Sequence, residues 1–141
     1  MKNRYLLDTN ILVFIVTGEI EEINRDVYAL MSDYENLFEI STISVMELIQ
    51  LHRIGKVRLK RGESVNGVLE KLEDETGIKI VPFNAPHTKT LSNLDIVDGH
   101  NDPFDHAIIS QAITDRYTLI SSDSKFKHYR DQNLNFVFNK R

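Results

Sequence analysis

The sequence predicts an α/β fold in which a central parallel sheet of about five strands is covered by helices on both faces. Short segments rich in β-branched residues alternate with segments of helical periodicity, and the strand segments are mainly hydrophobic without a regular apolar–polar alternation. The chain has 141 residues, a length typical of one domain, and contains no repeat, low-complexity tract or linker. We therefore expect a single domain over residues 1–141.

Five short segments have the composition of β-strands. They are residues 4–7, 38–41, 78–82, 118–121 and 135–138. Consecutive parallel strands are joined by right-handed connections. In open sheets of this kind, ligands collect outside the carboxyl ends of the strands, where loops lead into helix N-termini. The residues that follow the strands are therefore the first candidates for a functional site.

Apolar residues recur at helical spacing in four segments between the strands. These are residues 23–37, residues 44–53, a segment with Val65, Leu69 and Leu72 that ends near Gly77, and residues 102–117. Residues 11–16 are ambiguous. Their composition favours a strand, whereas their position between Asp8-Thr9-Asn10 and Gly18 also suits a short buried helix.

Composition limits the possible classes of function. The absence of cysteine excludes disulfide scaffolds, thiolate zinc sites and cysteine nucleophiles. The longest apolar run, residues 11–16, is too short to span a bilayer. Asp8 also comes too early to leave room for the apolar core of a signal peptide. We expect a cytoplasmic protein that does not act at a membrane.

The formal net charge of −4 argues at first against a nucleic-acid partner. The cations are nevertheless clustered, and phosphate contacts supply much of the sequence-independent affinity for RNA. A solvated loop is the alternative interpretation of such a cluster. Tyr129 could stack on a base or could close the edge of the fold. The candidate RNA contacts are Arg53, Lys56, Arg58, Lys60, Arg61, Lys127 and Arg130.

Four acidic residues fall where such a sheet would place a ligand site. Asp8 ends the first strand and Asp123 follows the fourth, while Glu47 and Asp105 lie in the first turns of two predicted helices. Crowded carboxylates repel one another unless a cation or a proton relieves them. All-oxygen donor sets suit Mg²⁺ or Mn²⁺. We expect one or two such ions, which would activate a water for attack on a phosphodiester.

Each acid also has a purely structural explanation. Ser44 and Glu47 fit a capping box, and the helix dipole favours Asp105 near a helix N-terminus. Asp8 and Asp123 could each cap a turn. Capping accounts for each acid singly, but it does not explain why four of them converge on one edge of one sheet.

The acids lie within four longer motifs. These are Leu6-Leu7-Asp8-Thr9-Asn10, Ser44-Val45-Met46-Glu47-Leu48, the segment that opens with Asp102-Pro103-Phe104-Asp105 and runs to Ala112, and Leu119-Ile120-Ser121-Ser122-Asp123. Together they resemble the PIN domain, and in particular the VapC-type toxins of bacterial type II toxin–antitoxin pairs. The motifs occur in the family's order and cover nearly the whole chain.

The resemblance implies an endoribonuclease that depends on Mg²⁺ or Mn²⁺ and whose catalytic, metal-binding pocket is formed by Asp8, Glu47, Asp105 and Asp123. Residues at the positions of Thr9, Asn10 and Ser121 support the pocket in the family. The implied partner is a small antitoxin whose C-terminal segment fills the active-site groove. Homodimerisation is common among these toxins, and the fold implied is a parallel-sheet α/β/α sandwich.

Three further residues near the motifs have competing explanations. Asp102 could support the metal site, although an N-cap before Pro103 explains it adequately. His106 stands where many of the toxins carry arginine. His100 and His106 match no common metal-ligand spacing, and we expect both to be surface residues.

Two other functions stay open at this point. A catalytically inactive PIN-like module would keep recognition of RNA or of an antitoxin without cleaving anything. A receiver domain or a dehalogenase-like phosphatase would also place an acidic pocket on an α/β sheet. The phosphatase would need a second aspartate where Asn10 stands, which argues against it.

Overall fold

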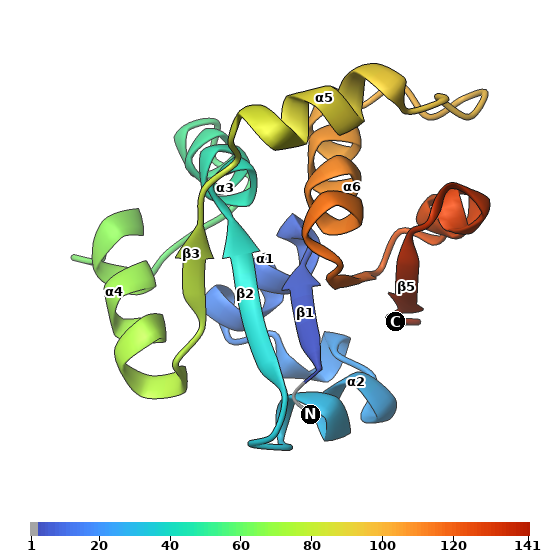
Figure 1. The fold of residues 1–141 in the computed structure, drawn as a ribbon. Coiled ribbons are helices and arrows are strands. Elements are labelled where there is room, and N and C mark those ends of the chain that lie inside the picture. The colour runs from blue at the N-terminus through green and yellow to red at the C-terminus, as the bar shows by residue number, and fades with distance from the viewer. Residues whose placement is uncertain (1–2) are drawn as a thin grey trace.

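The computed structural model describes residues 3–141, whose five strands form one parallel sheet (Figure 1). The strands are β1 (Arg4–Leu7), β2 (Leu37–Ser41), β3 (Lys79–Val81), β4 (Thr118–Ser121) and β5 (Asn135–Phe138). Their order is β3-β2-β1-β4-β5, so the first strand of the chain lies at the centre. The predicted α/β class and parallel sheet are confirmed.

Six α-helices were found in the described part of the chain, together with two short 3₁₀ segments. The helices are α1 (Thr9–Thr17), α2 (Arg25–Met31), α3 (Thr42–Arg53), α4 (Val65–Thr76), α5 (Ala85–Asn93) and α6 (Pro103–Asp115), and the 3₁₀ segments are η1 (Ile20–Glu22) and η2 (Ser124–Gln132). Between residues 3 and 141, none of the helices is long and apolar enough to cross a membrane.

The central strands β1 and β4 are buried on both faces of the sheet, because successive residues of each strand enter different hydrophobic clusters. Leu7 and Ile120 pack in a cluster with residues of α1 and α4, whereas the adjacent Leu6 and Leu119 pack in a second cluster with residues of α6. A strand that is buried on both faces has no reason to alternate between apolar and polar residues. This explains the continuous hydrophobic runs in the sequence.

The ambiguous residues 11–16 belong to a helix. Asp8 caps α1 by accepting a hydrogen bond from the Thr9 amide, and Gly18 ends the helix in the left-handed conformation with φ of 77°. Glycine adopts that conformation without the steric cost that a Cβ would bring. The helix predicted over residues 23–37 is shorter in the structure, where α2 spans Arg25–Met31.

The predicted capping box of Ser44 and Glu47 is wrong. α3 begins earlier than expected, and the hydroxyl oxygen of Ser41 caps it by accepting from the Ile43 amide at 3.0 Å. Ser44 lies within the helix, where its buried hydroxyl has no hydrogen-bond partner among residues 3–141. Glu47 is therefore beyond the first turn, and helix capping does not explain it.

Helix α5 has no counterpart among the helices predicted from the sequence. Its residues are mostly small or polar, so they carry no apolar period. The helix is held against α6 by side-chain contacts: His87 Nε2 lies 2.8 Å from Asp115 Oδ2, and the hydroxyl oxygens of Thr90 and Thr114 are 2.6 Å apart. Figure 1 shows α5 next to α6.

Candidate active site

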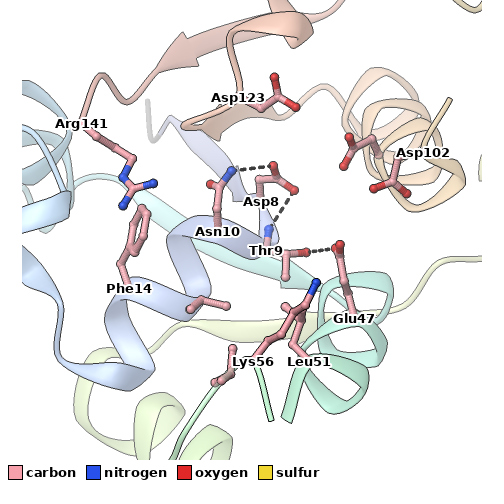
Figure 2. A pocket seen from close by; sticks show the side chains of 13 residues that line it. Asp8, Thr9, Asn10, Phe14, Glu47, Leu51, Lys56, Asp102, Asp123 and Arg141 are labelled. Atoms are coloured by element: carbon pink, nitrogen blue, oxygen red, sulfur yellow. Dashed lines mark hydrogen bonds between the residues drawn. The ribbon is translucent and has the colours of Figure 1, made fainter. Parts of the chain in front are cut away.

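The four predicted acids line one cavity of about 400 Å³ at the carboxyl edge of the sheet. Figure 2 shows this cavity, to which Asp8 directly after β1, the helices α1, α3 and α6, and the segment after β4 all contribute side chains. Thr9, Asn10 and Asp102 also line it, as do two cations, Lys56 and Arg141. The structure thus brings together acids that lie far apart in the sequence.

Asp8 is the central carboxylate of the cavity and is 3% exposed. Its oxygens accept hydrogen bonds from the Thr9 amide at 2.8 Å and from the Ser121 hydroxyl at 2.6 Å. The side-chain amide nitrogen of Asn10 lies 3.1 Å from Ser121 Oγ and 3.4 Å from Asp8 Oδ2. The three expected supporting residues therefore all contact Asp8.

One short hydrogen bond holds the Glu47 carboxylate in place. The Thr9 hydroxyl donates a hydrogen bond to Glu47 Oε1 at 2.5 Å, and this bond links α1 to α3. Thr9 consequently contacts two of the four acids, since its amide donates to Asp8. A residue with only a methyl group in this place could not make the second contact.

Asp123 and Asp102 cap helical segments and line the cavity as well. Asp123 caps η2 by accepting from the Lys125 amide at 2.9 Å, and Asp102 caps α6 by accepting from the Phe104 amide at the same distance. Asp105 follows in the first turn of α6. The structural and functional explanations of Asp102 and Asp123 are therefore compatible.

The concentration of buried negative charge raises several pKa values. Burial raises the pKa of Asp8 to about 7, with smaller contributions from the charges of Asp105 and Glu47, while the hydrogen bond from Ser121 opposes the shift. Burial also raises the pKa of Asp105 to about 7, and the neighbouring acids add to that shift. The pKa of Glu47 is raised mainly by burial. Ionising all of these groups together is costly unless a cation is present.

His100 and His106 are buried, so the expectation that they are surface residues is wrong. They are 3% and 8% exposed. His106 Nε2 donates to the carbonyl oxygen of His100 at 2.7 Å, and His100 Nε2 lies 2.9 Å from Asp105 Oδ2. Burial lowers the pKa of His100, which favours the neutral ring.

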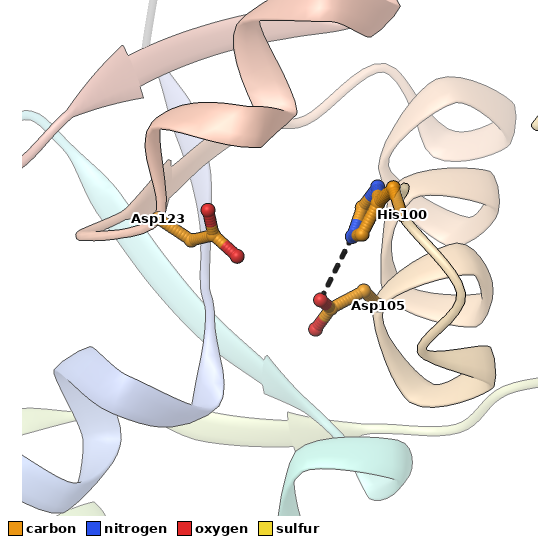
Figure 3. Close-up of side chains that lie close together, drawn as sticks. All are labelled: His100, Asp105 and Asp123. Carbon is orange, nitrogen blue, oxygen red and sulfur yellow. Dashed lines mark hydrogen bonds and ion pairs between the residues drawn. The ribbon is translucent and has the colours of Figure 1, made fainter. Parts of the chain in front are cut away.

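His100 is the site residue that sequence reasoning missed. One nitrogen of His100 and one oxygen each of Asp105 and Asp123 lie within 4.8 Å of one another (Figure 3). Ligand-spacing rules could not reveal this group, because His100 lies in the loop before α6 and folds back onto the first turn of that helix. A histidine just before a helix whose first turn carries an acid is the available signal.

The seven candidate RNA contacts do not form one group around the cavity. Lys56 lines it, whereas Lys60 lines a second cavity beside α4 and Arg130 lines a third with Arg116. All seven side chains are exposed. Tyr129 is fully buried, which favours the interpretation that it closes the fold.

Comparison with protein families gives a match to the PIN domain over residues 5–132. The chain belongs to the PIN domain family. A comparison of the sequence with curated proteins gives no significant match. The family resemblance seen in the four motifs is therefore confirmed by a match over most of the chain.

Solved structures share the PIN fold of this chain over nearly its full length. A chain of VapBC2 from Rickettsia felis, bound to a promoter DNA fragment, is 25% identical with a TM-score of 0.68, and 96% of this chain and 98% of that chain are covered. VapBC-1 from nontypeable Haemophilus influenzae is 18% identical with a TM-score of 0.61, and 98% of this chain and 99% of that chain are covered. VapBC-5 from Mycobacterium tuberculosis is 17% identical with a TM-score of 0.57, and 98% of each chain is covered.

The donor atoms at the centre of this PIN domain fit a hard divalent cation. They are carboxylate oxygens, which Mg²⁺ and Mn²⁺ prefer. Across residues 3–141, no lysine or arginine forms an ion pair with Asp8, Glu47, Asp105 or Asp123, and the one ion-pair contact to this group comes from His100. Among residues 3–141, the cavity's cations Lys56 and Arg141 line it without forming an ion pair with any of the four acids.

Proposed function

We propose that this PIN domain is a divalent-metal-dependent endoribonuclease and the toxin of a type II toxin–antitoxin pair. The observation that carries the proposal is the convergence of four acids in one cavity, where no lysine or arginine of residues 3–141 forms an ion pair with them. Asp8 and Asp123 come from the ends of two adjacent parallel strands, and Glu47 and Asp105 come from the helices beside them. Structural capping accounts for Asp123 but not for Glu47.

The acids would hold one or two cations, Mg²⁺ or Mn²⁺. Such an ion supplies a water of lowered pKa and stabilises the charge that develops on a phosphodiester. The chain's own residues hold the ligands in place: Ser121, Asn10 and the Thr9 amide orient Asp8, and the Thr9 hydroxyl orients Glu47. Asp102 fixes the start of α6, from which Asp105 projects.

The RNA would enter the cavity past Lys56. This exposed side chain lines the cavity on the side of Glu47 and Leu51, where its charge can meet a phosphate group. The other candidate RNA contacts would act at a greater distance or on a longer substrate. They are Arg53, Arg58, Lys60, Arg61, Lys127 and Arg130.

The toxin assignment is supported by the structural neighbours. VapBC-5 from Mycobacterium tuberculosis belongs to a family of toxin–antitoxin systems, and this chain shares its fold over nearly all of its length. By analogy, the partner proposed here is a small antitoxin that covers the acidic cavity. A homodimer and a cytoplasmic location complete the proposal.

Cleavage of total cellular RNA by the purified chain tests the proposal. Metal-dependent fragments should form in Mg²⁺ or Mn²⁺ and should be absent in EDTA and with Asp8→Asn. Unchanged cleavage by both Asp8→Asn and Asp105→Asn, in preparations free of contaminating nucleases, would contradict the assignment. Binding of Mn²⁺ and RNA without cleavage of any RNA would favour the inactive binding module instead.

A further inference from the structure

His100 is enclosed on all sides by other parts of the fold. Its ring packs at 5.0 Å from the His106 ring, 5.5 Å from Phe126 and 5.4 Å from Tyr129, measured between centroids. Its backbone is also fixed, because its amide donates to the Val97 carbonyl at 3.0 Å. Its carbonyl oxygen accepts from His106 Nε2. The imidazole therefore has one well-defined position next to Asp105.

Both ring nitrogens of His100 have partners, so the position of the ring proton depends on which of the two partners donates. The Val97 amide donates to the Tyr129 hydroxyl oxygen at 3.2 Å, which leaves the hydroxyl proton free to point elsewhere. The Tyr129 oxygen lies 2.9 Å from His100 Nδ1. When Tyr129 donates to Nδ1, the proton of the neutral ring must lie on Nε2.

The Nε2 proton then points at Asp105 Oδ2, 2.9 Å away. Within the described chain, the carboxylate of Asp105 makes no other hydrogen bond, whereas Asp8 receives bonds from two neighbouring segments. The orientation of Asp105 thus depends on a single contact with His100.

We propose that His100 and Tyr129 form a positioning relay that orients the Asp105 carboxylate for cation binding. The inference rests on the proposed metal site, and it adds to that site two residues outside the four acids and their immediate supports. His100 acts through Asp105 as a hydrogen-bond donor. Tyr129 acts through His100 by selecting its tautomer.

The relay assigns His100 a role different from that of a metal ligand. A nitrogen that donates its proton to Asp105 has no lone pair to offer a cation. Direct ligation through Nε2 would require the proton to move to Nδ1, where it would compete with the hydroxyl proton of Tyr129. Partners that orient a metal ligand typically contribute 10- to 100-fold to metal affinity.

The chain contains a matched control histidine. His87 is also buried, its Nδ1 accepts from the Asn84 amide at 2.8 Å, and its Nε2 lies 2.8 Å from Asp115 Oδ2. It therefore repeats the environment of His100, with a donor on one nitrogen and a carboxylate on the other. Neither His87 nor Asp115 lines the acidic cavity.

The test measures Mn²⁺ binding to the full chain by electron paramagnetic resonance. Melting temperatures in EDTA show whether each variant is folded. We expect His100→Ala to weaken Mn²⁺ affinity by about 10- to 100-fold. His100→Gln, whose amide can donate in place of Nε2–H, should recover most of the loss, and Tyr129→Phe should cause a smaller loss. His87→Ala should lower the melting temperature and leave Mn²⁺ affinity unchanged.

Three outcomes would overturn the relay. They are wild-type affinity in both His100→Ala and His100→Gln, an equal loss of affinity in His87→Ala, or a nitrogen hyperfine coupling that shows His100 bound directly to Mn²⁺. Failure of the proposed metal site gives a different result, because the wild-type chain would then bind no Mn²⁺ or Asp8→Asn would bind it equally well. Tyr129→Phe and His100→Gln keep the test valid if His100→Ala does not fold.

Discussion

The Thr9 hydroxyl donates to Glu47 Oε1 at 2.5 Å, which ties the start of α1 to the middle of α3. Because the Thr9 amide also donates to Asp8, one residue sets the relative position of two acids that the sequence separates widely. The distance between two potential ligand carboxylates therefore depends on a side chain that need not touch a cation.

Replacing this hydroxyl should weaken activity more than it weakens the fold. In Thr9→Val the side chain keeps its shape but cannot donate to Glu47, and we expect RNA cleavage to fall about 10- to 100-fold through weaker metal binding. Thr9→Ser retains the donor and is the control. Cleavage at several Mn²⁺ concentrations measures the effect, which should be smaller when the metal is in excess. Equal cleavage by both variants would contradict the role of the bond.

The raised pKa of Asp8 predicts how the stability of the metal-free protein changes with pH. Its pKa is about 7 in the fold against an ordinary value of 3.8. The folded protein therefore binds this proton more tightly than the unfolded chain, and the resulting stabilisation is complete below about pH 4 and lost as the pH rises through about 7. In EDTA, Asp8→Asn should be more stable than the wild type at pH 8 by on the order of 2–4 kcal/mol.

Urea unfolding of both proteins across this pH range measures the prediction. The difference in unfolding free energy between Asp8→Asn and the wild type should shrink as the pH falls toward 4, where the wild-type carboxyl is protonated. A difference that stays constant with pH would show that Asp8 does not titrate in this window.

Divalent cations should stabilise the protein, and they should do so more strongly at high pH. A ligand that binds the folded state alone at 100 times its Kd adds about 2.7 kcal/mol. At pH 8 the acids are ionised before the cation binds, whereas at pH 5.5 the cation must displace protons from Asp8 and Asp105. Melting temperatures with Mn²⁺ and with EDTA at the two pH values give the comparison. If Mn²⁺ raised the melting temperature equally at both pH values, Asp8 and Asp105 would not be the residues that bind the cation.

Lys56 should contribute to RNA binding and not to the fold. It is an exposed cation in the lining of the cavity, so Lys56→Ala should raise KM for RNA and reduce the salt dependence of cleavage without changing the melting temperature. Lys89→Ala removes the same charge from an exposed position on α5 and is the control. Identical KM values for the two variants would place the RNA elsewhere.

Local patterns in the sequence were sufficient to predict the strands. The segments 4–7, 118–121 and 135–138 coincide with β1, β4 and β5. In β1 and β4 the consecutive apolar residues reflect burial on both faces of the sheet. The convergence of the four acids was also predictable, since strand ends in a parallel sheet share one edge. These features depend on the fold class more than on any particular contact.

The features that were missed depend on contacts between distant segments. α5 has no apolar period and is held by His87 and Thr90 against α6. His100 became a site residue only because its loop folds back to Asp105 and because Tyr129, 29 residues later, reaches its other nitrogen. Helical spacing rules describe one element at a time and cannot detect contacts between elements.

The central position of β1 has a consequence for biosynthesis. Asp8 is synthesised 113 residues before Ser121, whose hydroxyl bonds to it. The strand that carries Ser121 pairs directly with β1, so the acidic pocket stays incomplete until β4 has emerged from the ribosome. If this PIN domain is the ribonuclease proposed above, we expect a nascent chain that has not yet produced β4 and Asp123 to be unable to cleave RNA.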